Sequence, residues 1–253
     1  MPSLILNALT GMPLIQKDDD LGNILDLALD ENQITLEDGD VLILAQKIIS
    51  KAEGRIVDLG TVIPSPEALR LADETQKDPR LVELILQEST QVLRSRPGLI
   101  IVEHKLGFVS ANAGIDRSNV AGKGAEKVLL LPENPDQSAN RLRDYFQKNH
   151  EIDLGILIID SHGRAWRNGT VGISIGFSGL PGIVDLRGES DLFDYKLQAT
   201  EVAAVDELAA GASLLMGQAA EVLPVVHARG FPYPLREGSF SELPRERARD
   251  LFK

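Results

Sequence analysis

The sequence predicts a mixed α/β (α+β) fold in a single domain over residues 1–253, with room for two lobes. Two apolar runs, Val41–Leu44 and Leu154–Ile159, are continuous enough to be strands of a sheet that is covered on both faces. Helix-start signals recur between such runs. A chain of 253 residues, of which 43% are hydrophobic and 25% charged, has a globular composition and can bury a substantial core.

Further strands are predicted from short apolar segments. These segments are Leu4–Leu6, Leu99–Val102, Val128–Leu131 and Leu223–Val226. The stretch Val171–Gly176 alternates Gly or Ser with β-branched residues. This pattern predicts a strand that another element approaches closely on one face.

The predicted helices begin at capping residues. Such signals stand at Asp18–Asp20, Ser65–Pro66, Asp78–Pro79 and Pro135–Asp136. We expect Thr200 to cap the longest helix, whose apolar face includes Val205 and Leu208 and whose end lies at Gly217.

Composition excludes several classes of function. The net charge of −12 argues against a nucleic-acid-binding surface, and the absence of cysteine excludes thiolate metal sites and thiol nucleophiles. The N-terminus shows no signal peptide, and no apolar run approaches the roughly 18 residues of a membrane span. We therefore expect a cytoplasmic protein without a membrane or nucleic-acid partner.

The loop Gly107–Asn119 combines flexible backbone with short polar side chains. Gly107 and Gly114 permit positive φ, and the segment looks too rich in small residues for a packed strand. Its polar members are Asn112, Asp116, Ser118 and Asn119. A metal-bound phosphate would satisfy these groups if the loop is buried. An ordinary Asx-turn explains the same residues.

Two further segments place charge directly after predicted strands. Lys47, Lys51 and Arg55 follow Val41–Leu44 and could bind a polyphosphate, although a solvated amphipathic turn explains them too.

After Leu154–Ile159 come Asp160 and Ser161, whose carboxylate and hydroxyl form a plausible ligand pair for Mg²⁺ or Mn²⁺. Arg164 and Arg167 could hold an acidic substrate or a transferring phosphoryl group. An ion-pair network that closes the strand end is the alternative.

The chain contains no Walker A, Gly-x-Gly-x-x-Gly or His-Glu-x-x-His motif. Five other segments stand together in a fixed order. They are Gly11–Ile15, Gln46–Arg55, Gly107–Asn119, Asp160–Arg167 and Asp206–Gln218. In this order and at these separations they resemble the coenzyme F-420:L-glutamate ligase family, the gamma-glutamyl ligases of the deazaflavin cofactor. The resemblance runs from about residue 4 to residue 230.

The resemblance implies a ligase that uses GTP as co-substrate and needs Mg²⁺ or Mn²⁺ at two sites, often with K⁺. It implies that an amide bond joins L-glutamate to the coenzyme F-420 precursor, F-420-0. Our hypothesis for the mechanism is an acyl-phosphate intermediate, with release of GDP and phosphate. The resemblance also implies a family-specific fold that is neither Rossmann nor P-loop, and an intertwined homodimer.

The resemblance also assigns residues to roles. The metal ligands would be Asp116, Asp160, Ser161 and Gln218. The nucleotide would contact Met12, Pro13, Leu14, Ile15, Gln46, Lys47, Lys51, Asn119, Met216, Gly217, Gln218, Ala219, Ala220, Glu221, Val222 and Leu223. Our own mechanistic hypothesis adds that the metals and Lys51 neutralise the γ-phosphate, with Arg164 and Arg167 as candidates for holding acidic substrate groups.

Two positions depart from the family pattern. Ser161 stands where Thr is common, which keeps the hydroxyl, and Ala165 stands where Pro is common, which leaves the loop less rigid. We expect no fused C-terminal reductase-like domain.

The sequence leaves three questions open. The general base is Glu103, His104, His162 or none of these, and no motif encodes the number of glutamates added. The same features fit a ligase with a different carboxylate acceptor, and they fit a non-catalytic nucleotide- or deazaflavin-binding protein.

Overall fold

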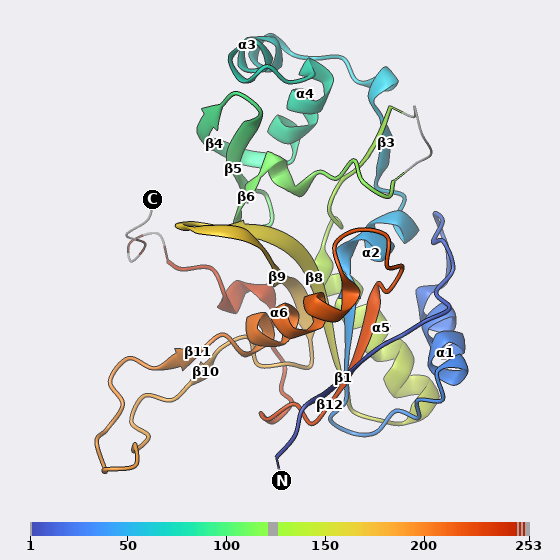
Figure 1. Ribbon diagram of the computed structural model, residues 1–253, viewed down its shortest axis with the longest axis vertical. Helices are drawn as coiled ribbons and strands as arrows, with labels where there is room; N and C mark the ends of the chain where they lie inside the picture. The colour runs from blue at the N-terminus through green and yellow to red at the C-terminus, as the bar shows by residue number, and fades with distance from the viewer. Residues whose placement is uncertain (1, 121–125, 247, 249, 251–253) are drawn as a thin grey trace.

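The computed structural model describes residues 2–120, 126–246, 248 and 250. A five-stranded sheet with the order β1-β12-β2-β8-β9 lies at its centre (Figure 1). The strands are β1 Ile5–Ala8, β12 Val225–Arg229, β2 Val41–Ala45, β8 Gly155–Arg164 and β9 Arg167–Ser178. Strands β2 and β8 are parallel, and the other neighbouring pairs are antiparallel.

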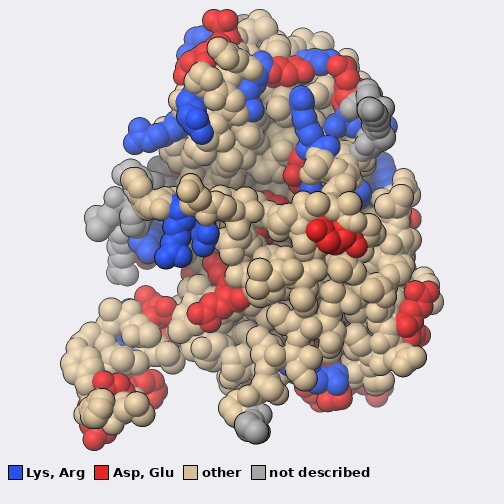
Figure 2. Space-filling view, in the orientation of Figure 1, with Lys and Arg blue, Asp and Glu red and all other residues tan. Residues whose placement is uncertain are grey.

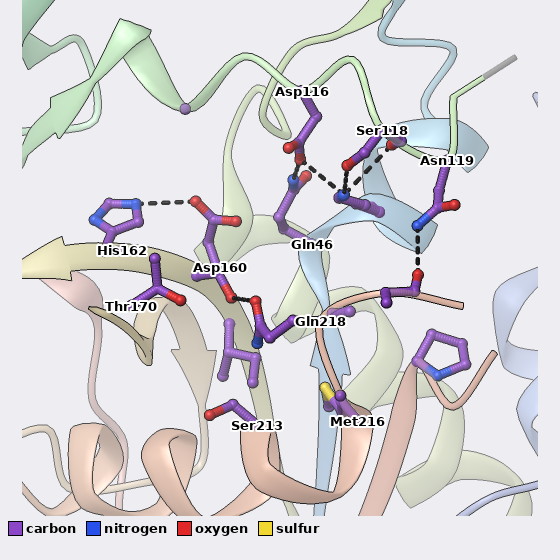
Figure 3. Close-up of a pocket in the computed structure, with 18 of the residues that line it drawn as sticks. Gln46, Asp116, Ser118, Asn119, Asp160, His162, Thr170, Ser213, Met216 and Gln218 are labelled. Carbon is purple, nitrogen blue, oxygen red and sulfur yellow. Dashed lines mark hydrogen bonds and ion pairs between the residues drawn. The ribbon is translucent and has the colours of Figure 1, made fainter. Parts of the chain in front are cut away.

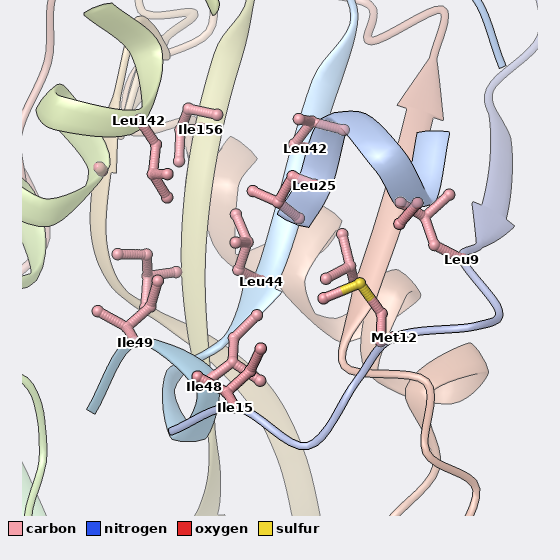
Figure 4. Close-up of a cluster of buried hydrophobic side chains, with 14 of the residues drawn as sticks. Leu9, Met12, Ile15, Leu25, Leu42, Leu44, Ile48, Ile49, Leu142 and Ile156 are labelled. Atoms are coloured by element: carbon pink, nitrogen blue, oxygen red, sulfur yellow. The ribbon is translucent and has the colours of Figure 1, made fainter. Parts of the chain in front are cut away.

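Helices cover both faces of this sheet, as the two apolar runs predict. Helices α1 (Leu21–Glu31) and α5 (Pro135–His150) pack on one face, and α6 (Ala204–Met216) packs on the other. A hydrophobic core lies on each face of the sheet, and alternate residues of β2 point into one core or the other. Leu42 and Leu44 point to the side of α1 (Figure 4).

A second lobe has its own hydrophobic core, at the top of Figure 1. Helices α3 (Pro66–Thr75) and α4 (Pro79–Gln87) pack there against a three-stranded antiparallel sheet. Its strands are β4 Ser89–Arg96, β5 Leu99–His104 and β6 Val109–Ala111. The pair β3 (Ile56–Asp58) and β7 (Lys127–Leu129) contributes to a small apolar cluster with α4. The short helix α2 (Gln46–Ala52) lies between this lobe and the large sheet (Figure 1).

A long hairpin projects from the body of the molecule (Figure 1). Its base is the pair β10 (Val184–Asp185) and β11 (Glu201–Val202). Three short 3₁₀ turns complete the described structure, η1 Leu59–Thr61, η2 Asn112–Gly114 and η3 Phe240–Glu242. Within the described residues, no helix is both long and apolar enough to span a membrane.

The predicted helix starts are confirmed. The side chains of Asp20, Ser65 and Asp78 each accept a hydrogen bond from a backbone N–H in the first turn of α1, α3 and α4, and Asn134 does so for α5. Capping is a local interaction, so it can be read from the sequence.

The prediction for Thr200 was wrong. Helix α6 begins at Ala204, because Glu201 and Val202 pair with β10 instead of entering the helix. At 13 residues α6 is also shorter than α5, which has 16.

Two strand predictions need correction as well. The strand predicted to end at Ile159 continues to Arg164, because β9 pairs with it along this length. Val109–Ala111 forms β6 despite its small residues, since β5 supplies a partner edge. Gly107 and Gly114 do have positive φ.

The glycine pattern of β9 is confirmed as a site of close approach. A Cβ added at Gly172 would lie 2.6 Å from the carbonyl oxygen of Ala209 in α6. The absence of a side chain therefore lets α6 lie directly on the sheet.

Candidate active site

A cleft of about 1220 Å³ opens between the two lobes. Figure 2 shows the molecule hollowed at this level. Helix α2, the loop after β6, the hairpin of β8 and β9, and the segment after α6 all contribute side chains to it (Figure 3).

Asp116 lies in the cleft with two polar partners from α2. Gln46 Nε2 donates a hydrogen bond of 2.9 Å to Asp116 Oδ2, and Lys47 Nζ lies 3.5 Å from the same oxygen. The backbone N–H and C=O of Asp116 both pair with Leu129, which holds the loop in place. Burial raises the pKa of Asp116. The positive charge of Lys47 opposes this rise, and the negative charge of Asp160 adds to it. The two carboxylates therefore influence one another electrostatically.

Asp160 and Ser161 reach the cleft from β8. Ser161 Oγ donates a hydrogen bond of 2.6 Å to Gln218 Oε1, which joins the strand to the segment after α6. The buried ring of His162 places Nε2 2.9 Å from Asp160 Oδ2 (Figure 3). Phe108 packs against the same ring, with 5.1 Å between ring centres. His162 is thus fixed beside Asp160.

The lysines of α2 are one helical turn apart and both line the cleft. Lys47 Nζ donates a hydrogen bond of 3.0 Å to Ser118 Oγ. The side-chain ammonium of Lys51 makes no hydrogen bond or ion pair with another described residue. Burial and then the charge of Lys47 lower the pKa of Lys51. A bound polyanion would relieve both effects.

Arg55 does not join these lysines. Its Nε donates to the carbonyl oxygen of Leu131 at 2.9 Å, and its Nη2 lies 2.6 Å from Glu88 Oε2. The third basic residue of this segment therefore ties α2 to neighbouring elements.

The segment after α6 closes the cleft from the side of the large sheet. Gly217 has φ of +70°, which turns the chain out of the helix. Asn119 Nδ2 donates a hydrogen bond of 2.9 Å to the carbonyl oxygen of Ala219 (Figure 3). The loop of Asp116 and the segment of Gln218 are thereby connected.

The structure brings nearly all of the predicted site residues to this one cleft. The lining residues among them are Pro13, Leu14, Ile15, Gln46, Lys47, Lys51, Asp116, Asn119, Asp160, Ser161, Arg164, Arg167, Met216, Gly217, Gln218, Ala219, Ala220, Glu221, Val222 and Leu223. Met12 is the exception, because its side chain is buried in the core beside α1 (Figure 4).

Only one of the three candidate bases lines the cleft, and it is His162. His104 is buried and stacks on Phe108, and its Nδ1 accepts a hydrogen bond from the backbone of Leu106. Burial lowers the pKa of His104 to about 4. His104 is therefore a neutral structural residue near neutral pH.

Sequence reasoning missed several lining residues. Thr170 and Ser213 project into the cleft (Figure 3), as do apolar residues of β5 and β6. No local signal marks them, since their role depends on which elements face each other.

The oxygen donors of the cleft suit a hard divalent cation. Asp116 and Asp160 offer carboxylates, Ser161 a hydroxyl and Gln218 an amide oxygen. Mg²⁺ is typically held by one or two carboxylates, with substrate phosphates and water completing its shell. The described residues contain no group of three His, Cys, Asp or Glu side chains placed to hold a metal.

The fold and the cleft define a two-lobed α/β protein in which two lysines and two carboxylates share one cleft. Comparison with known proteins specifies the class. The model of the F420-0:gamma-glutamyl ligase family matches residues 11–230. The chain belongs to this family.

Its relatives cover it almost end to end. The coenzyme F420:L-glutamate ligase of Methanothermobacter thermautotrophicus is 45% identical over 245 residues, which is 96% of each chain. That of Methanocaldococcus jannaschii is 44% identical over 87% of each chain. That of Methanopyrus kandleri is 41% identical over 100% of this chain and 99% of its own.

Proposed function

We propose that this protein is a coenzyme F420:L-glutamate ligase that adds L-glutamate to F420-0. Its membership of the F420-0:gamma-glutamyl ligase family supports this proposal, together with identities above 40% over nearly whole relatives. The observation that carries it is the convergence of Asp116, Asp160 and Gln218, from three distant parts of the chain, on one cleft.

We further propose that GTP drives the reaction with Mg²⁺ or Mn²⁺, assisted by K⁺. Asp116, Asp160, Ser161 and Gln218 would hold the divalent ions, which neutralise phosphate charge when bound. The ammonium of Lys51, which has no partner among the described residues, supports a phosphate-binding role for α2.

The chemistry then consists of two transfers. A carboxylate oxygen of F420-0 attacks the γ-phosphorus of GTP and the bond to GDP breaks, which leaves an acyl phosphate. The amine of L-glutamate attacks the acyl carbon, phosphate leaves and the nitrogen loses a proton. The protein contributes positioning and charge stabilisation. Arg164 and Arg167, exposed at the rim, would hold the acidic groups of the substrates.

We also propose that the protein is a homodimer. The projecting hairpin supports this, because Leu192 and Phe193 near its tip are 96% and 88% exposed. Large apolar side chains at such a tip are typical of protein–protein contacts.

One incubation tests the function. Purified protein, F420-0, L-glutamate, GTP and Mn²⁺ are combined, and the deazaflavin is analysed by mass spectrometry with GDP and phosphate measured in parallel. We expect mass increments of one or more glutamate residues, one GDP for each amide formed, and no product without GTP. An unchanged deazaflavin mass in the complete mixture contradicts the proposal.

A further inference from the structure

One face of the small sheet is apolar and lines the cleft. In β5, Ile100 and Val102 are fully buried in the lobe core, so Leu99 and Ile101 point the opposite way. Ile101 is the cross-strand partner of Ala111 in β6. Leu99, Ile101, Val109 and Ala111 all line the cleft, and we name these four residues the apolar wall.

The protein itself leaves the apolar wall uncovered. Val109 is 42% exposed, and Leu99 and Ile101 are partly exposed. An antiparallel sheet that turns one face to water normally carries polar residues on that face. Open apolar side chains inside a cleft are typical of a surface that a ligand covers.

The apolar wall leads directly to the proposed metal ligands. The chain passes from Ala111 through the turn η2 and Ile115 to Asp116. The nucleotide residues Lys51 and Met216–Leu223 lie on other elements, α2 and the segment after α6. The wall is therefore a separate part of the same cleft.

The cleft is large enough for more than one ligand. Its volume of about 1220 Å³ exceeds the roughly 300–1000 Å³ of a pocket for a single drug-sized ligand. A nucleotide bound beside the lysines of α2 would leave space next to the apolar wall. The opposite side of this room is the β8–β9 hairpin, with the polar residues Arg164, Arg167 and Thr170.

We propose that the apolar wall holds the flat aromatic ring of the deazaflavin acceptor. This inference rests on the proposed function and extends it, because it assigns the ring to Leu99, Ile101, Val109 and Ala111. The acidic side chain of the acceptor then extends past Ile115 towards Asp116 and Asp160. Arg94 and Arg96 are cross-strand partners of Ile101 and Leu99, so their exposed guanidinium groups border the same face and can stack on a ring.

The test uses a polar double variant, Ile101→Thr with Val109→Thr, which keeps β-branched side chains in the strands. Val92→Thr is the matched control, because Val92 is 36% exposed in the same sheet and does not line the cleft. Replacing two apolar contacts by hydroxyls should raise KM for F420-0 roughly tenfold. KM for GTP and kcat should stay within about twofold, and Val92→Thr should match the parent protein.

A binding measurement separates this inference from the proposed function. 5-Deazariboflavin carries the ring without the acidic side chain, so its binding can be followed by its fluorescence without turnover. Binding to the parent protein and to Val92→Thr, with about tenfold weaker binding to the double variant, supports the ring site even if no glutamylated product forms. Glutamylation with an unchanged KM for F420-0 in the double variant overturns the inference and leaves the function intact. A raised KM for GTP instead would place the guanine on the wall and also overturn it.

Discussion

Asp116 is held partly out of water between Gln46 and Lys47, and we propose it as a ligand of a divalent cation. Burial and the nearby Asp160 make its negative charge unfavourable, which raises its pKa. A bound divalent cation would make the ionised form of Asp116 favourable, because it would bring positive charge to both carboxylates.

Replacing Asp116 by Asn should therefore separate activity from stability. We expect ligase activity to fall at least about a hundredfold, because the divalent ion that would neutralise the phosphoryl charge loses a carboxylate ligand. The melting temperature of the metal-free protein should stay the same or rise, since an unfavourable buried charge is removed. Steady-state assays and calorimetry measure the two effects. Asp144→Asn, on the exposed side of α5, is the control, and a large loss of stability in Asp116→Asn would contradict this account.

His104 should impose a pH dependence on stability. Its pKa is about 4 in the folded protein, against 6.5 for a free histidine, because burial disfavours the charged ring. Between these values the unfolded chain binds a proton that the folded protein does not, so the free energy of unfolding rises with pH by up to about 1.4 kcal/mol per unit. Urea titrations at pH 4.5, 5.5 and 7 measure this slope. In His104→Asn the slope should become shallower, and an unchanged slope would refute the assignment.

At the level of elements, the contact between β9 and α6 positions part of the site. Gly172 lets the helix lie close to the sheet, and the helix ends at Met216, two residues before Gln218. The packing of α6 on β9 therefore fixes the position of Gln218, which is a predicted metal ligand.

We expect Gly172→Ala to damage both stability and activity. The added Cβ meets a backbone carbonyl oxygen of α6 at 2.6 Å, so the helix must move, at a cost of roughly 2 kcal/mol. Thermal unfolding should show a lower melting temperature, and KM for GTP should rise with the shift of the segment after α6. For stability, Gly163→Ala is the control, because its Cβ meets no atom within 4 Å. Equal melting temperatures for the two variants would argue against tight packing at Gly172.

At the level of the whole molecule, two lobes with separate cores enclose the cleft, and the hairpin of β10 and β11 extends away from both. In the proposals above, the nucleotide would bind at one end of this cleft and the deazaflavin ring at the other. We propose the hairpin as the dimer contact, because Leu192 and Phe193 near its tip are exposed.

Phe193→Asp should convert the proposed dimer into a monomer. A charge at an aromatic contact cannot be buried without a large desolvation cost. Light scattering coupled to gel filtration measures the mass in solution. Leu69→Asp, an exposed site on α3, should leave the dimer intact. A monomeric parent protein, or a dimeric Phe193→Asp, would contradict the proposal.

The sequence by itself determined four of the helix starts, the central buried strands and most of the polar residues that share the cleft. Caps at Asp20 and Ser65 act over three residues, and β2 and β8 bury both faces, so each leaves a local pattern. The cleft residues were predictable because they lie in five motifs whose order and spacing identify the family.

The tertiary structure decided which face of each element meets which partner. Met12 and Arg55 belong to predicted site motifs, yet one enters the core and the other ties α2 to Glu88. Leu99 and Ile101 have the pattern of a buried strand, yet they face the cleft. The physical reason is that a side chain is buried only where a second surface packs against it. A strand specifies its two faces locally, but only the packing of the lobes determines which of them a ligand can reach.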